Sequence, residues 1–430
     1  MYKGKAQELL KDIEVGDRIV LKKDKKSYEG ILMPRTELGD DEHIVLKLDN
    51  GYNIGFDVAG LDIKRVETGA KIEIKSTPID VVYDKEKPDI TIIGTGGTIA
   101  SKIDYKTGAV HPSFSTEDLL NAIPELAGIA NIKTQVLFNI LSENMSPNHW
   151  VKIANECANE LNSGADGVVV AHGTDTMGYT AAALSFILKD LSKPVVLVGS
   201  QRSSDRPSSD STLNMISAVK VAASDIAEVT VVMHSTSSDR VCDIHRGTKV
   251  RKMHSSRRDA FRSINTIPLG RVGDKIEVFQ SYNKRSNRNV KVDDKFEEKV
   301  ALVKIYPGIK PDVLDYFIAN NRGVVLEGTG LGHVPEELLD PIQRAKEVGK
   351  PVVMTTQTLY GTVDMKVYST GRELLERGVI SATDMLPETA YVKLMHILGH
   401  AEDYQEIKKL MQTNIAGEFS GTIRVDTFPL

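Results

Sequence analysis

The feature that most constrains the fold is a series of short, largely apolar runs, each followed by a loop and then a stretch with helical spacing. These runs are residues 91–93, 168–171, 195–198, 229–233, 301–305, 323–327 and 351–354. Strands without polar alternation are typical of parallel sheets that helices cover on both faces. From Asp89 onwards the sequence therefore predicts an α/β fold with mostly parallel sheets.

The residues before Asp89 have a different pattern. A helical segment around residues 6–13 precedes four alternating segments, at 18–23, 28–33, 43–48 and 52–58. The last two flank Asn50-Gly51, a dipeptide typical of type I′ hairpin turns. Closely spaced short strands with tight turns predict a small antiparallel β-barrel, which a charged connector with prolines joins to the rest of the chain.

These changes divide the chain into three expected domains. The small β-barrel and its connector take residues 1–85, a first α/β domain takes 86–285, and a second takes 286–430. The polar, charged stretch 281–298 is expected to link the two α/β domains. Ser146 and Pro147 predict the N-cap and first residue of a helix with an apolar face, and further helices are expected to start near Thr176 and Ser208.

Composition narrows the class of protein. The chain has 430 residues and a net charge of −5, which argues against coating nucleic acid by bulk charge. Cys157 and Cys242 are the only cysteines, too few for a disulfide framework or a cysteine metal site. The N-terminus has no apolar signal region, and no apolar run reaches the roughly 18 residues of a membrane span. We expect a soluble, cytoplasmic protein without membrane contact.

Two loops follow neighbouring apolar runs and carry hydroxyl groups. Residues 94–98 read Gly-Thr-Gly-Gly-Thr, and residues 172–176 read His-Gly-Thr-Asp-Thr. Loops after parallel strands share one edge of the sheet, so Thr98 and Thr174 can face one pocket. Ile99 breaks the dinucleotide fingerprint and no P-loop ending is present, so nucleotide binding is not expected. The alternatives are a simple glycine turn and a helix N-terminus capped by Thr174 or Asp175.

Residues 95–100 and 172–177 resemble the two signatures of the L-asparaginase/glutaminase family, and residues 193–200 resemble the strand that follows in that family. The resemblance runs from about Asp89 to the C-terminus. It implies an asparaginase-like two-domain body and an amidohydrolase for glutamine or asparagine. It implies no metal and no cofactor on this chain.

The resemblance also implies roles for individual residues. Thr98 takes the position of the nucleophile, and Thr174 and Asp175 take those of the second signature. Lys252 takes the position of the catalytic lysine; Arg251 competes for it, but a guanidinium cannot give up its proton. A Lys252 that acts as a base through Thr174 needs a pKa lowered by roughly 3 units, which burial and a nearby Arg251 charge would both favour.

Further positions follow from the same resemblance. Tyr105 matches the tyrosine of the mobile active-site lid and is the alternative activator of the nucleophile. Asp175 is expected to bind the substrate α-ammonium, and Ser142 the α-carboxylate. Glu143 stands where many bacterial members have an amide, and its alternative is an exposed loop acid. Asp364 matches an acid lent by a neighbouring subunit.

A small barrel before an asparaginase-like body resembles the GatD family of archaeal Glu-tRNA(Gln) amidotransferases. The resemblance implies a homodimer within a heterotetramer, in which a GatE-type subunit uses ATP and Mg²⁺ to activate Glu-tRNA(Gln) and receives ammonia from this chain. The alternatives are a stand-alone cytoplasmic L-asparaginase and a binding module without turnover. The basic clusters at residues 22–26 and 284–291 either contact tRNA phosphates or are solvated.

Overall fold

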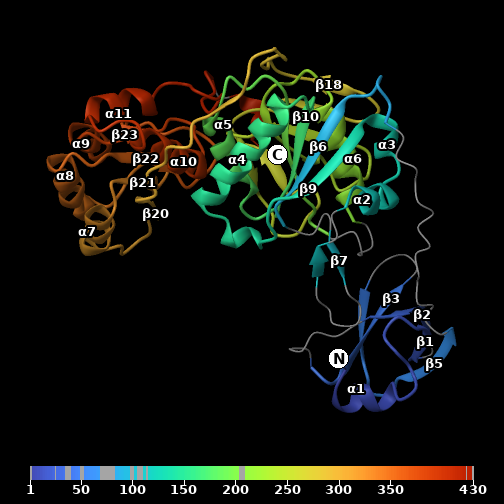
Figure 1. Cartoon of the computed structure of the whole chain (residues 1–430). Helices are drawn as coiled ribbons and strands as arrows, with labels where there is room; N and C mark the ends of the chain where they lie inside the picture. The colour runs from blue at the N-terminus through green and yellow to red at the C-terminus, as the bar shows by residue number, and fades with distance from the viewer. Residues whose placement is uncertain are drawn as a thin grey trace.

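The computed structural model describes residues 2–24, 26–33, 40–48, 53–67, 83–96, 101–103, 110–112, 115–202, 209–422 and 424–428. Figure 1 shows the N-terminal part in blue and a larger α/β body in cyan to red. No helix in these ranges combines the length and the apolar character that a membrane crossing requires.

The N-terminal part is a five-stranded antiparallel sheet with one short helix. Its elements are α1 (Gly4–Leu9), β1 (Arg18–Lys23), β2 (Lys26–Leu32), β3 (His43–Leu48), β4 (Asn53–Asp57) and β5 (Asp62–Glu67), and the strand order is β4-β3-β2-β1-β5. Ile19, Leu21, Ile44 and Leu46 bury one face of the sheet against Ala6 of α1. The four predicted strands are confirmed to within two residues, and β5 was not predicted. The Asn50-Gly51 turn lies outside the described residues, and closure of the sheet into a barrel stays a prediction.

The first α/β domain contains an eight-stranded sheet in the order β18-β17-β14-β13-β12-β10-β6-β9. The parallel part consists of β6 (Asp89–Gly94), β9 (Asn131–Val136), β10 (Gly167–Ala171), β12 (Val195–Val198) and β13 (Val229–His234). The antiparallel part consists of β14 (Cys242–Arg246), β17 (Gly270–Val272) and β18 (Ile276–Val278). β6, β10, β12 and β13 confirm predicted apolar runs, whereas β9 and the antiparallel extension were not predicted.

Helices cover both faces of this sheet (Figure 1). Val168 and Val170 of β10 pack in the core with α4 (Pro147–Asn162) and α5 (Met177–Ile187). Val169 and Ala171 pack in the opposite core, with α2 (Thr116–Ala122), α3 (Leu126–Ile129) and α6 (Ser211–Ala222). Side chains alternate across a strand, so a run that is apolar at every position serves both cores.

The helix starts correct two details of the prediction. α4 begins at Pro147 as expected, and Trp150 on its apolar face is buried. Ser146 occupies the N-cap position, but its side chain does not cap the helix; its Oγ lies 2.7 Å from Nδ1 of His149 instead. α6 begins at Ser211, later than the predicted start near Ser208, which lies outside the described residues.

The second α/β domain has a four-stranded parallel sheet of β20 (Val300–Lys304), β21 (Gly323–Gly328), β22 (Val352–Thr356) and β23 (Ile380–Ser381). Its helices are α7 (Pro311–Asn320), α8 (Leu339–Glu347), α9 (Ser369–Glu376), α10 (Pro387–Leu398) and α11 (Tyr404–Met411). Leu184 and Ile187 of α5 share one hydrophobic core with Leu394 and Met395 of α10. The two α/β domains are therefore joined by a continuous core.

Short elements complete the body. They are the hairpins β7 (Ser101–Ile103) with β8 (Val110–Pro112) and β15 (Val250–Lys252) with β16 (Phe261–Ser263), the pair β11 (Leu188–Lys189) with β19 (Lys291–Val292), and the 3-10 turns η1 (Ser142–Asn144), η2 (Glu336–Leu338) and η3 (Val425–Thr427).

The expected linker at residues 281–298 runs along the first α/β domain. β19 within it pairs with β11, and the backbone of Val290 exchanges two 2.9 Å hydrogen bonds with the side chain of Asn162. Arg285 in the basic cluster donates to the carbonyl of Ser224, and Arg288 lies 3.3 Å from Asp190. This segment is therefore bonded to the domain surface over much of its length.

Two buried ion pairs hold the C-terminal segment, residues 412–422. Nζ of Lys249, beside β15, lies 2.7 Å from Oδ2 of Asp384, and the same carboxylate accepts the backbone N–H of Ser420. Nζ of Lys393 on α10 lies 2.6 Å from Oε1 of Glu418, and both side chains are fully buried. Burial lowers the pKa of Lys249 and of Lys393, while the paired carboxylates oppose that shift. Losing either partner would leave a buried charge uncompensated.

Candidate active site

The two signature loops lie side by side at the carboxyl edge of the parallel strands. β6 and β10 are adjacent in the sheet, and each leads directly into one of the loops. Both the backbone N–H and the Oγ1 of Thr95 donate to the carbonyl of Ala171, at 3.0 and 2.9 Å. The first signature is thereby bonded to the end of the strand that carries the second, as the sequence predicted.

Two glycines let a third segment approach these loops. At Gly96, whose φ is +116°, a Cβ would lie 2.1 Å from the carbonyl oxygen of Ile140. At Gly173 a Cβ would lie 2.6 Å from the Cβ of Ser142. The hydroxyl of Thr176 donates to the carbonyl of Ser142 at 2.7 Å. Because only glycine tolerates both approaches, the signatures place Ser142, which is buried, against the second loop.

His172 stabilises the turn that presents Thr174. Its Nδ1 lies 2.6 Å from the carbonyl of Gly173, and its Nε2 lies 2.9 Å from Oγ1 of Thr180. A carbonyl only accepts, so Nδ1 carries the proton and Nε2 accepts from the Thr180 hydroxyl. Burial lowers the pKa of His172 to about 4, so the ring is neutral at pH 7. His172 is therefore a structural support for the loop.

Lys252 reaches the second signature from the hairpin of β15 and β16. Its Nζ donates to Oγ1 of Thr174 at 2.9 Å and lies 2.7 Å from Oδ1 of Asp175. The Lys252 side chain is 14% exposed and that of Asp175 is 66% exposed, so the ammonium is covered while the carboxylate opens to solvent. The N-cap of α5 is Thr176, so the alternative in which Thr174 or Asp175 caps the helix is wrong.

Arg251 does not take part in this cluster. Neighbouring strand residues point to opposite faces, and Nη1 of Arg251 lies 2.8 Å from Oε2 of Glu388 on α10. Burial raises the pKa of the Glu388 carboxyl, and the Arg251 guanidinium opposes that rise. The Glu388 carboxylate therefore offsets the positive charge of Arg251, which was expected to act on Lys252. Glu388 itself was not predicted, because no local pattern connects residues 137 positions apart.

The remaining predicted residues lie apart from these contacts. Thr98 and Tyr105 lie outside the described residues, so their roles stay predictions. Glu143 follows Ser142 and is exposed. Asp364 is exposed in the second domain, where its carboxylate accepts the N–H of Lys366 at 3.1 Å. The described structure thus brings Thr174, Asp175 and Lys252 into contact and places Ser142 beside them.

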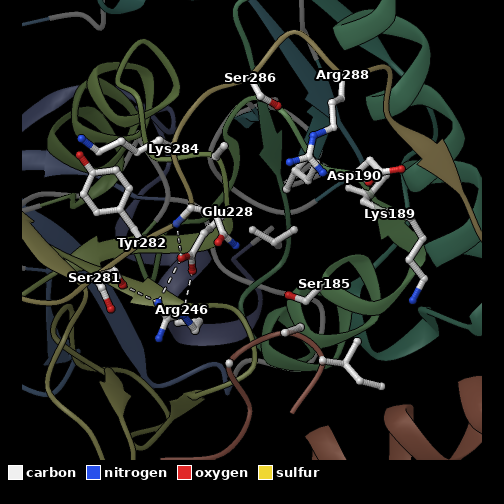
Figure 2. Close-up of a pocket in the computed structure, with 18 of the residues that line it drawn as sticks. Ser185, Lys189, Asp190, Glu228, Arg246, Ser281, Tyr282, Lys284, Ser286 and Arg288 are labelled. Atoms are coloured by element: carbon white, nitrogen blue, oxygen red, sulfur yellow. Dashed lines mark hydrogen bonds and ion pairs between the residues drawn. The ribbon is translucent and has the colours of Figure 1, made fainter. Parts of the chain in front are cut away.

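A cavity of about 760 Å³ lies away from this cluster, against the start of β13 and the end of α5 (Figure 2). Arg246 pairs in it with Glu228 at 2.7 and 3.1 Å and donates to the carbonyl of Ser281. Parallel strands begin at this edge of the sheet, opposite the signature loops. We assign no reaction to the cavity, because its central charges are paired with each other.

One group of side chains in the described part of the chain has the composition of a metal site: Asp293, His396 and His400. The backbone N–H of Asp293 donates to the carbonyl of Ile187, the last residue of α5. Thr174 lies just before the first turn of the same helix. An 11-residue helix is about 16 Å long, so this group does not belong to the Lys252 cluster.

Comparisons with known proteins agree with this architecture. The sequence matches the family "Asparaginase, N-terminal" over residues 89–284, the "Glutaminase/Asparaginase C-terminal domain" over 299–411 and the "GatD N-terminal domain" over 13–66. It is 56% identical to the D subunit of the glutamyl-tRNA(Gln) amidotransferase of Pyrococcus horikoshii, with 99% of each chain covered. It is 52% identical to the D subunit of the same enzyme from Methanothermobacter thermautotrophicus, with 97% of each chain covered.

Solved structures confirm the fold of the body. The thermostable L-asparaginase from Thermococcus kodakarensis is 37% identical with a TM-score of 0.69, and the match covers 78% of this chain and 100% of that one. L-asparaginase I from Vibrio cholerae is 34% identical with the same TM-score, and the match covers 78% of this chain and 99% of that one. The body has the asparaginase-like two-domain α/β fold, and the N-terminal sheet is an addition to it.

Proposed function

The chain belongs to the asparaginase/glutaminase family and, within it, to the D subunits of glutamyl-tRNA(Gln) amidotransferases, and from this membership we propose that it hydrolyses the side-chain amide of glutamine. The ammonia it releases would convert Glu-tRNA(Gln) to Gln-tRNA(Gln). The observation that carries the proposal is the contact of Lys252 with both Thr174 and Asp175, on segments 78 and 77 residues away.

The reaction we propose is a double displacement. Thr98 attacks the side-chain carbonyl carbon of glutamine, and the base that takes the Thr98 proton gives it to the amide nitrogen as the C–N bond breaks and ammonia leaves. Water then gives a proton to the same base and cleaves the acyl-threonine ester; the proton returns to Thr98 and glutamate is released. The hydroxyl proton of Thr98 passes to Lys252 through Thr174, or to Tyr105. No step in this sequence requires a metal ion.

Asp175 connects the proposed substrate site with Lys252. Its carboxylate is exposed, and its Oδ1 lies 2.7 Å from Nζ of Lys252. The α-ammonium of glutamine would be a second cation for the same carboxylate. Ser142 would bind the α-carboxylate of the substrate, and Glu143 would strengthen the contact with its α-ammonium.

The N-terminal domain favours the tRNA-dependent pathway. The D-chain relatives of the amidotransferase match this chain over nearly its whole length, including the residues before Asp89. We propose that this chain works in the cytoplasm as a homodimer within a heterotetramer. A GatE-type subunit there would bind ATP and Mg²⁺, activate Glu-tRNA(Gln) and receive the ammonia.

A stand-alone L-asparaginase is the second candidate, because the body alone spans the full length of a solved L-asparaginase. One experiment separates the two candidates: ammonia release from glutamine and from asparagine, measured for the chain with and without the GatE-type partner and Glu-tRNA(Gln). We expect glutamine hydrolysis that rises with the full complex. Asparagine hydrolysis without any response to the partner would support the second candidate. No ammonia from either amide, alone or in the complex, would indicate a binding module without turnover.

A further inference from the structure

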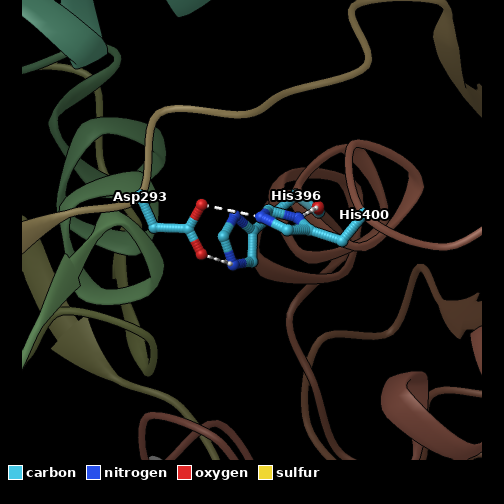
Figure 3. Close-up of side chains that lie close together, drawn as sticks. All are labelled: Asp293, His396 and His400. Carbon is cyan, nitrogen blue, oxygen red and sulfur yellow. Dashed lines mark hydrogen bonds and ion pairs between the residues drawn. The ribbon is translucent and has the colours of Figure 1, made fainter.

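Three side chains from distant segments meet where the two α/β domains join; we name Asp293, His396 and His400 the junction cluster. His396 lies in the last turn of α10 and His400 follows four residues later, so both rings lie on one side. Asp293 lies in the linker of residues 281–298, 107 residues from His400. Figure 3 shows the carboxylate of Asp293 facing both imidazoles, one oxygen toward each ring. Its Oδ1 lies 2.7 Å from Nε2 of His400, and its Oδ2 lies 3.6 Å from Nε2 of His396.

The hydrogen bonds of His400 determine which nitrogen faces the carboxylate as an acceptor. Its Nδ1 lies 2.7 Å from the backbone carbonyl of His396, which can only accept, so Nδ1 carries the ring proton. Nε2 of His400 and Oδ1 of Asp293 lie 2.7 Å apart, and both atoms can bind one cation, which would hold them somewhat further apart.

His396 presents a second lone pair to the same place. Nζ of Lys189 lies 3.2 Å from its Nε2, and an ammonium only donates, so Nε2 is the acceptor. The same Nζ lies 4.0 Å from Oδ2 of Asp293. The Lys189 side chain is 36% exposed, whereas that of His396 is 5% exposed. Lys189 is therefore the more exposed partner, and a metal ion at the cluster would displace its ammonium from Nε2 of His396.

We propose that the junction cluster is a Zn²⁺ site, with Nε2 of His396, Nε2 of His400 and a carboxylate oxygen of Asp293 as ligands and water in the fourth position. The ligand atoms of the three residues all lie within 4.8 Å of one another. Zn–N and Zn–O bonds of about 2.0–2.2 Å in a tetrahedron separate ligand atoms by roughly 3.3–3.6 Å, so small side-chain shifts complete the site. Two imidazoles with one carboxylate suit Zn²⁺ better than Mg²⁺ or Ca²⁺, which prefer oxygen ligands.

The role of this site is structural. Asp293 is bonded to the end of α5 in the first domain, and both histidines belong to the end of α10 in the second. The ion would cross-link the linker of residues 281–298 to the end of α10. It departs from the expectation of no metal on this chain, but it lies far from Lys252 and leaves the hydrolysis metal-independent.

The test uses the full chain, stripped with a chelator and titrated with Zn²⁺ against a chromophoric competitor. We expect one Zn²⁺ per chain and a rise in Tm when Zn²⁺ is added. His400→Gln and Asp293→Asn should each weaken Zn²⁺ affinity by about 100-fold or more. Lys189→Met should strengthen it, because the competing ammonium is gone. His43→Gln is the matched control, since it removes another histidine–aspartate pair, with Asp40 at 2.9 Å, and should change nothing.

Equal Zn²⁺ affinity in the wild type and in His400→Gln would overturn the proposal, as would a Tm that does not respond to Zn²⁺. Weaker binding by Lys189→Met would do the same, and this variant keeps all three ligands. Glutamine hydrolysis by the stripped chain reports separately on the proposed function, because that reaction uses none of the junction residues.

Discussion

At the scale of single residues, the contact between Lys252 and Thr174 is the arrangement from which the chemistry follows. Nζ of Lys252 donates to a hydroxyl on one side and faces a carboxylate on the other. In the proposed relay, the proton of the nucleophile reaches Lys252 through the Thr174 hydroxyl. Changing that hydroxyl alone therefore tests whether the relay operates.

We expect Thr174→Val, which keeps the shape but removes the hydroxyl, to lower kcat for ammonia release by about 10²–10⁴-fold. Lys252→Met should do the same, and the double variant should lose little more, because both residues act in one unit. Thr98→Ala should abolish turnover. Thr174→Ser is the matched control and should retain most activity. Near-wild-type rates in folded Thr98→Ala, with circular dichroism as the check, would refute the nucleophile assignment.

A second prediction concerns acid stability. Burial lowers the pKa of His172 and of His245 to about 4, from the ordinary value of 6.5. Between these pH values the unfolded chain binds protons that the folded protein excludes, so the free energy of unfolding falls as pH falls from 6.5 towards 4. Each ring can account for about 3 kcal/mol over that window.

Urea denaturation from about pH 7 to about pH 4.5 measures this loss. His172→Asn keeps an N–H donor for the Gly173 carbonyl but does not titrate, so its stability should fall less steeply with acid. An identical slope in His172→Asn and in the wild type would contradict the prediction.

Residue-level prediction from the sequence worked where a role depends on a local motif. Thr174, Asp175 and Lys252 were predicted and do meet, because the motif and the strand order determine their place. His172 was recognised only as part of a motif, and its support of the Gly173 carbonyl depends on Thr180, eight residues further on. The junction cluster was not predicted. His396 and His400 are four positions apart, but the third member, Asp293, is remote in sequence.

At the scale of elements, the Arg251–Glu388 pair joins the hairpin that carries Lys252 to helix α10. The carboxylate is buried, and the guanidinium is 32% exposed. A double-mutant cycle with Arg251→Met and Glu388→Gln should give a coupling energy of about 1 kcal/mol, because one partner remains partly solvated. Urea denaturation at neutral pH measures all four proteins.

The Arg377–Glu373 pair, four residues apart at one helix end, is the matched comparison for that cycle, because its carboxylate is 46% exposed rather than buried. Its coupling should be only about 0.3–0.5 kcal/mol. If the Arg251–Glu388 cycle gave no coupling, α10 would not position the hairpin through this contact.

Strands that are buried on both faces were predicted well, because they appear in the sequence as apolar runs. The parallel strands other than β9 and β23 follow those runs, and the four predicted N-terminal strands follow alternation. β14, β17 and β18 were missed, because they are short and mix charged with apolar residues, as in Arg271 of β17. The stretch 281–298 was predicted as a linker because it is polar. Polarity alone does not indicate the many backbone contacts that this stretch makes with the first domain.

At the scale of the whole molecule, release of ammonia should depend on the acceptor. A chain that supplies ammonia to a partner wastes glutamine when no acceptor is bound. We expect steady-state glutamine hydrolysis to rise about 5 to 150-fold when the GatE-type partner and Glu-tRNA(Gln) are added, which corresponds to a coupling of about 1–3 kcal/mol. Uncharged tRNA serves as the control. Equal rates for the isolated chain and the full complex would favour a stand-alone asparaginase.

The buried ion pairs of the C-terminal segment have a consequence for the order of synthesis. Lys249 and Arg251, on either side of Val250, are bonded to Asp384 and Glu388, 135 and 137 residues later in the chain. Glu418, which pairs with Lys393, lies later still in the chain. A nascent chain completes its first α/β sheet well before these partners leave the ribosome. The hairpin that carries Lys252 therefore gains its contacts with the second domain last, and a chain whose translation stops early has the signature loops without these contacts.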